Sequence, residues 1–199
     1  MGVLIDAAGS VGAQNYSERA LVLLEESLAH LRAVEDIFGI AALLSSLGSM
    51  AGKQGDDQRA RVLLAESLGL FHEVGGKLGV YPTLMEFARI VAAQGQQRAE
   101  LERATRLYGA AEALEVSMAD RQRFLKRYLD LAYGAAEALE GNMANFAVLE
   151  PDSTTHQRTI AMLLTQLGEA AFAAAWAEGR AMTAEQALAY ALADDTKSS

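Results

Sequence analysis

The feature that most constrains this chain is a ten-residue segment that occurs twice. Residues 19–28 and residues 59–68 are identical at eight of ten positions and lie forty residues apart. The same offset pairs Gly39 with Gly79, and a shifted third copy begins at Arg103. An internal period of about 20–50 residues is typical of proteins built from stacked structural repeats. We therefore expect a repeat protein in which each unit packs mainly on its neighbours in the sequence.

Each unit is predicted to contain two helices. Apolar residues within 41–53 and within 57–74 recur at the spacing that places side chains on one face of a helix. Gly55 and Asp56 separate the two segments, because glycine favours the end of a helix and aspartate caps the start of one. Pro82 is expected near the start of the following helix, where its missing N–H costs least.

Small residues recur where the paired helices are expected to cross. Together with the turn between the helices, they resemble the tetratricopeptide repeat, in the longer form that occurs in bacterial signalling ATPases and regulators. The residues that carry this resemblance are Leu47-Gly48, Gly55-Asp56, Ala60 and Ser67. The resemblance implies an all-α fold, namely a TPR-like α-solenoid of antiparallel helix pairs with a repeat of about forty residues.

The repeats are expected to occupy residues 1–116. At the same offset residues 1–14 align with 41–54 and look like the back half of a first helix whose front is missing, so we expect a truncated first repeat in a chain that is a fragment or a truncated relative of a longer protein. A helical C-terminal element without repeats is expected over residues 117–193. Residues 194–199 are polar and are expected to form a disordered tail.

Several helices are predicted within the C-terminal part. Residues 154–167 and 169–178 show helical spacing, and Thr183 with Gln186 forms the capping box of a last helix. The octapeptide Tyr-Gly-Ala-Ala-Glu-Ala-Leu-Glu begins at Tyr108 and recurs at residue 133. We interpret this second copy as a duplication without a separate function.

A second resemblance involves the C-terminal end of the chain. Residues 167–172, 175–180 and 185–187, with the segment 108–112, are similar to the C-terminal end of LuxR-type or SARP-type transcriptional regulators and signalling ATPases. Residues 119–150 depart from that pattern, because relatives have a shorter loop there. In this family the NTPase and DNA-binding domains lie elsewhere in the chain. The resemblance therefore implies a sensor or scaffold module.

Composition and charge narrow the functions further. The chain has no cysteine, which excludes disulfides, cysteine-based zinc sites and thiol catalysis. Its net charge is −9, and it lacks the basic stripe that direct nucleic-acid binding needs. The first fifteen residues make a poor signal peptide and no apolar run approaches the ~18 residues of a membrane span, so we expect a cytoplasmic location and no membrane partner.

The sequence contains no motif typical of catalysis, cofactor binding or metal binding. Gly76-Lys77 is not a P-loop, because Phe71 replaces the first glycine and Leu78 replaces the serine or threonine. The three histidines, His30, His72 and His156, show no metal-ligand spacing. We therefore expect no enzyme activity, no catalytic residue, no metal and no cofactor.

The remaining candidate site is a partner-binding groove. In TPR-like stacks the first helix of each pair lines the concave face, and by this resemblance the groove residues are Ser45, Ser49, Lys53, Met85 and Arg89. Met85 offers adaptable apolar contact, and Lys53 or Arg89 offers a charge for a carboxylate. Alternatively, these five positions belong to an ordinary solvent-exposed helix face that binds no partner.

The leading function is therefore a non-catalytic protein–protein interaction module that binds a protein or peptide partner. One alternative is a homo-oligomerisation module, a homodimer in which the alanine-rich C-terminal helices pair between chains. Another is a small-ligand receptor that holds an inducer inside the curve of the stack.

Overall fold

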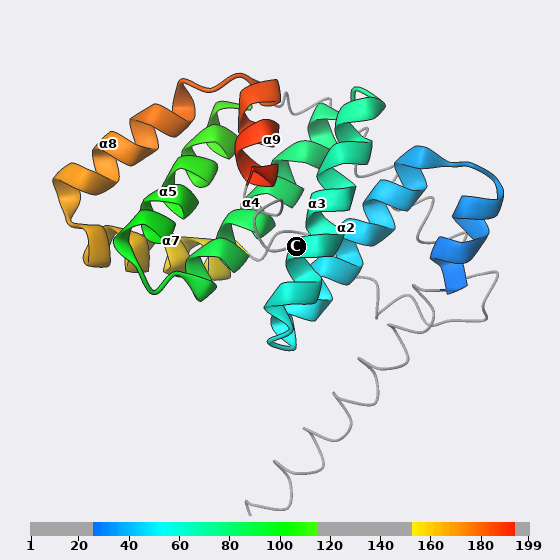
Figure 1. Cartoon of the computed structure of the whole chain (residues 1–199), viewed down its shortest axis with the longest axis horizontal. Helices are drawn as coiled ribbons and strands as arrows, with labels where there is room; N and C mark the ends of the chain where they lie inside the picture. The colour runs from blue at the N-terminus through cyan, green and yellow to red at the C-terminus, as the bar shows by residue number, and fades with distance from the viewer. Residues whose placement is uncertain (1–25, 115–152, 194–199) are drawn as a thin grey trace, which may run out of the picture.

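The computed structural model describes residues 26–114 and 153–193, and this part of the chain is entirely helical (Figure 1). After a helical segment at 26–33 come α2 (Ile37–Lys53), α3 (Asp57–Glu73), α4 (Lys77–Gln94), α5 (Arg98–Ala113), α7 (Ser153–Leu167), α8 (Glu169–Arg180) and α9 (Ala184–Leu192). For these residues the prediction of an all-α fold is confirmed. The expected truncated repeat, the second octapeptide and the tail lie outside the described residues.

The first helices are joined by three similar turns. Glu35, Gly55 and Gly75 lie twenty residues apart in these turns and have positive φ angles of 56°, 81° and 65°. Asp36 and Asp56 follow two of them and cap the next helix, each accepting a hydrogen bond of 3.1 Å from a backbone N–H three residues on. The predicted roles of Gly55 and Asp56 are thus confirmed.

Helices α2 to α5 pack on one another in chain order. Each of them contacts the next, and α2 also contacts α4. Figure 1 shows them as a side-by-side array coloured from cyan to green. Between them lie fully buried apolar side chains from all four helices, including Leu44, Leu64, Leu84 and Leu107. Apolar burial of this kind is the main favourable term in folding.

The small residues predicted at the helix crossings lie where α2 meets α3. A Cβ atom added at Gly48 would be 2.7 Å from Leu64 Cγ, so only glycine lets the helices approach this closely. Ala60 is fully buried, and Ser67 Oγ donates a hydrogen bond of 2.7 Å to the backbone oxygen of Ala41. The prediction for these three positions is confirmed.

The C-terminal helices fold back onto this array. Helix α8 packs along α5, while α7 contacts α4, α5 and α8, and α9 lies across α3, α4 and α5. The approach of α5 and α8 is close enough to require glycine on both sides. A Cβ atom at Gly109 would overlap the backbone of Trp176, and one at Gly179 would overlap the backbone of Arg106.

Two predicted details differ from the structure. Helix α2 starts at Ile37, four residues earlier than predicted, because the side chain of Asp36 caps it. Pro82 is the sixth residue of α4 and not one of its first, so the helix lacks one backbone hydrogen bond in its second turn. No helix in the described ranges is long and apolar enough to span a membrane.

Candidate functional site

The predicted groove residues lie on α2 and α4, which contact each other. Ser45, Ser49 and Met85 are half-buried, and Lys53 is exposed in the last turn of α2. Ser45 Oγ lies 3.0 Å from Thr83 Oγ1, a hydrogen bond that joins α2 to α4. The two helices therefore pack on each other, and whether the five side chains line one groove that binds a partner stays a prediction.

Arg89 already has a carboxylate partner inside the molecule. Its Nη2 donates to Glu86 Oε1 at 2.8 Å, and the two side chains are 14% and 13% exposed. Burial opposes the charged guanidinium, but the hydrogen bond and charge of Glu86 outweigh this penalty and raise the pKa of Arg89. Nη2 would also lie 2.5 Å from a Cβ at Gly52, so the guanidinium reaches α2 beside Lys53.

A buried polar cluster lies next to this ion pair. Tyr108 on α5 is fully buried, and its hydroxyl lies 3.1 Å from Nδ1 of His156 on α7, which is 4% exposed. The other ring nitrogen of His156 lies 3.7 Å from Glu86 Oε2 on α4. Sequence reasoning missed this cluster, because its members lie far apart in the chain and belong to no motif.

The geometry of the cluster suits helix docking better than catalysis. Burial raises the pKa of Tyr108 well above its ordinary value, so its hydroxyl keeps its proton and remains a hydrogen-bond donor. A neutral His156 can then accept that hydrogen bond at Nδ1 and direct Nε2–H toward Glu86. Tyr108 and His156 are buried where α4, α5 and α7 meet. The cluster instead fixes α7 onto α4 and α5.

Two of the segments that carried the C-terminal resemblance, 108–112 and 175–180, meet at the contact of α5 with α8. Trp176 Nε1 donates to Glu112 Oε2 at 2.9 Å, and its ring stacks on Tyr108 with centroids 6.5 Å apart. Arg106 Nε donates to Glu178 Oε2 at 2.6 Å. Residues 108–112 and 175–180 are thus two sides of one helix interface.

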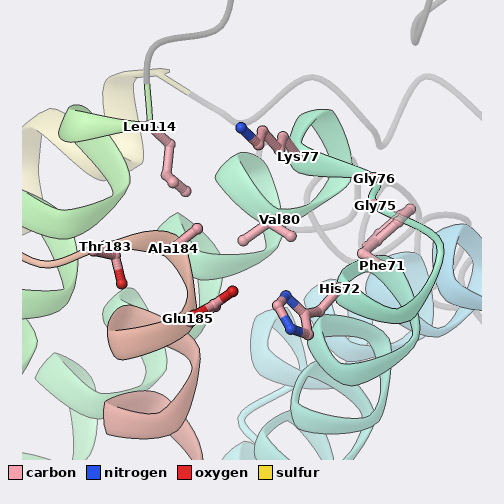
Figure 2. Close-up of a pocket in the computed structure, with 10 residues that line it drawn as sticks. All are labelled: Phe71, His72, Gly75, Gly76, Lys77, Val80, Leu114, Thr183, Ala184 and Glu185. Atoms are coloured by element: carbon pink, nitrogen blue, oxygen red, sulfur yellow. The ribbon is translucent and has the colours of Figure 1, made fainter.

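An open pocket of about 390 Å³ lies on another side of the array (Figure 2). It is bounded by the end of α3, the start of α4, Leu114 after α5, and the first residues of α9. Its rim carries three ionisable side chains, which are those of His72, Lys77 and Glu185. Within residues 26–114 and 153–193, no three acidic or histidine side chains gather closely enough to hold a metal ion.

Comparisons of the chain with protein-family models, with curated proteins and with solved structures gave no match.

Proposed function

We propose that this chain is a non-catalytic protein-interaction module, the sensor or scaffold part of a bacterial signalling or transcriptional regulator. In this proposal α2 to α5 form a TPR-like α-solenoid with a repeat of about forty residues. The first helix of each pair, α2 and α4, lines the groove that binds a peptide or partner domain.

The observation that carries the proposal is the regular spacing of turns and contacts. The positive-φ residues at 35, 55 and 75 recur every twenty residues, which is half the sequence period. Gly39 and Gly79, forty residues apart, occupy similar places, because a Cβ at either would meet the side chain eight residues earlier, Leu31 or Phe71. Repeated contacts of this kind support a stack of equivalent helix pairs.

The surface chemistry supports a peptide or protein ligand. Ser45, Ser49 and Met85 are half-buried and offer hydrogen-bonding and adaptable apolar contacts on adjoining helices. Lys53 offers an exposed cation at the end of α2, whereas Arg89 is held by Glu86. We therefore assign charge recognition in the groove to Lys53 and give Arg89 a role in holding the groove wall.

The test uses peptides selected from a random display library against the whole chain. Binders that occupy the groove should compete with one another, and Met85→Asp or Lys53→Glu should weaken them by about tenfold or more. Val62→Asp is the control, because Val62 is 54% exposed on α3. Binders that tolerate both groove substitutions, or a library that yields no binder, would contradict the proposal.

A second candidate function is homo-oligomerisation. The outward face of α8 carries the exposed alanines Ala170, Ala173, Ala174 and Ala177, which would let a helix from a second chain approach closely. Light scattering over a range of concentrations tests this candidate. A mass that stays monomeric at every concentration excludes it and leaves the groove proposal unaffected.

A further inference from the structure

The last described helix, α9, is short and lies across the others. It has nine residues and contacts α3, α4 and α5, and Figure 1 shows it in red across that array. A helix of fewer than ~12 residues is only marginally stable in water when it stands alone. The helical state of α9 therefore depends on its contacts with the rest of the chain.

The apolar contacts of α9 involve small side chains. Ala187 and Ala191 are its buried residues, 1% and 0% exposed, while Leu188 and Tyr190 are half-buried. The hydrophobic contribution of a side chain grows with the apolar area that it removes from water. Two buried alanines therefore stabilise the docked α9 less than Leu107 and the other large buried side chains stabilise α5.

A charged side chain of α5 holds the C-terminal end of α9. Arg103 Nη2 donates to the backbone oxygen of Ala191 at 2.9 Å and to that of Tyr190 at 3.3 Å. The guanidinium carbon of Arg103 also lies 6.0 Å from the centre of the Tyr190 ring. The last carbonyls of a helix have no partner within the helix and carry a partial negative charge, so a cation stabilises them. Arg103 thus fixes the end of α9 onto α5.

The N-terminal end of α9 is capped by its own residues. The backbone N–H of Thr183 donates to Gln186 Oε1 at 2.8 Å, and the N–H of Gln186 donates to Thr183 Oγ1 at 3.2 Å. These bonds stabilise the first turn of the helix and do not attach it to α3, α4 or α5. They can therefore persist when α9 leaves the array, whereas the contact with Arg103 cannot.

We propose that α9 is a strap that opens while the rest of the fold stays folded, and that Arg103 is the contact that holds it closed. In the closed state the first residues of α9 form one wall of the pocket in Figure 2. In the open state the pocket joins the apolar surface of the array that Ala187 and Ala191 cover. The proposal concerns α9 and not the α2–α4 groove, so it does not rest on the proposed function.

Hydrogen exchange of the whole chain tests this proposal, because amides in a unit that opens locally exchange without global unfolding. The protection factors of α9 should be at least about tenfold lower than those of α5. Arg103→Gln removes the charge and keeps a hydrogen-bonding side chain. It should therefore quicken exchange in α9 by about tenfold and leave α2 and α3 unchanged.

A second variant acts on the other end of the same helix. Thr183→Ala removes the cap of α9 and should quicken exchange in α9 by about fivefold, again with no change in α2 and α3. Arg98→Gln is the control, because Arg98 also lies on α5 but pairs with Glu102 of its own helix at 2.9 Å. The control should leave exchange in α9 unchanged.

An open strap should also expose apolar surface. Arg103→Gln should therefore bind the dye anilinonaphthalene sulfonate more strongly than Arg98→Gln does. Three results would overturn the proposal. The first is exchange in α9 as slow as in α5. The second is an Arg103→Gln variant in which α9 is unchanged, or in which α2, α3 and α9 quicken equally, because α9 would then open only with the whole fold. The third is equal dye binding by the two arginine variants.

Discussion

At the scale of single residues, Glu35 adopts a backbone conformation that suits glycine. Its φ of 56° lies in the left-handed region, where the corresponding turns have Gly55 and Gly75. Glu35→Gly removes the cost of this conformation, and the greater freedom of glycine in the unfolded chain offsets part of that gain. The substitution should therefore raise the free energy of unfolding by about 0.5–1 kcal/mol. Urea denaturation measures the change.

Gly75→Ala, which meets no neighbouring atom, should lower stability by about 1 kcal/mol, because alanine rarely adopts the positive φ of this position.

The buried hydroxyl of Tyr108 has a measurable effect at alkaline pH. Because its pKa is raised in the folded state, Tyr108 keeps its proton while the unfolded chain loses it above the ordinary value of about 10. The unfolded state then binds fewer protons, so stability falls as pH rises. The wild type should lose about 1 kcal/mol more than Tyr108→Phe for each pH unit above about 10. Parallel stability curves for the two proteins would refute the assignment.

At the scale of elements, the contact of α5 with α8 depends on two glycines. A Cβ at Gly179 would overlap main-chain atoms of Arg106, which cannot move aside as a side chain can. Gly179→Ala should therefore cost about 1–3 kcal/mol or more. Gly69→Ala in α3 is the control, since nothing lies near it, and it should stabilise the helix by about 0.5–1 kcal/mol. Equal effects in thermal unfolding would contradict the close approach of α5 and α8.

The elements differ in how well the sequence predicts them. Most helices were predicted close to their observed bounds. The signals that predict a helix are the spacing of apolar residues, the glycines and the caps such as Asp56 and Thr183. Each of these signals acts within a few residues of the chain. The buried contact of Tyr108 with His156 was not predictable in this way. It exists only because α7 returns to α5 across forty-eight positions of sequence, and no local pattern encodes that docking. Lys77 of α4 and Glu185 of α9 line the same pocket for the same reason.

At the scale of the whole molecule, α5 joins the first helices to the C-terminal ones. It contacts α4 on one side and α7, α8 and α9 on the others. Leu107 lies fully buried within it, and Leu107→Ala should cost about 2–5 kcal/mol. Hydrogen exchange should then quicken in both α4 and α8. Faster exchange in only one of them would show that the two groups of helices unfold separately.

The pairing of Arg89 with Glu86 has a consequence for how a partner would reach the groove. Since these opposite charges lie 2.8 Å apart, Arg89 and Glu86 together add little to the electric field that a partner of the proposed groove would meet. Arg89 would therefore contribute little to the electrostatic steering of a partner or to the dependence of the association rate on ionic strength. Partners of the proposed groove would then differ mainly in the dissociation rate of the complex, and less in its association rate.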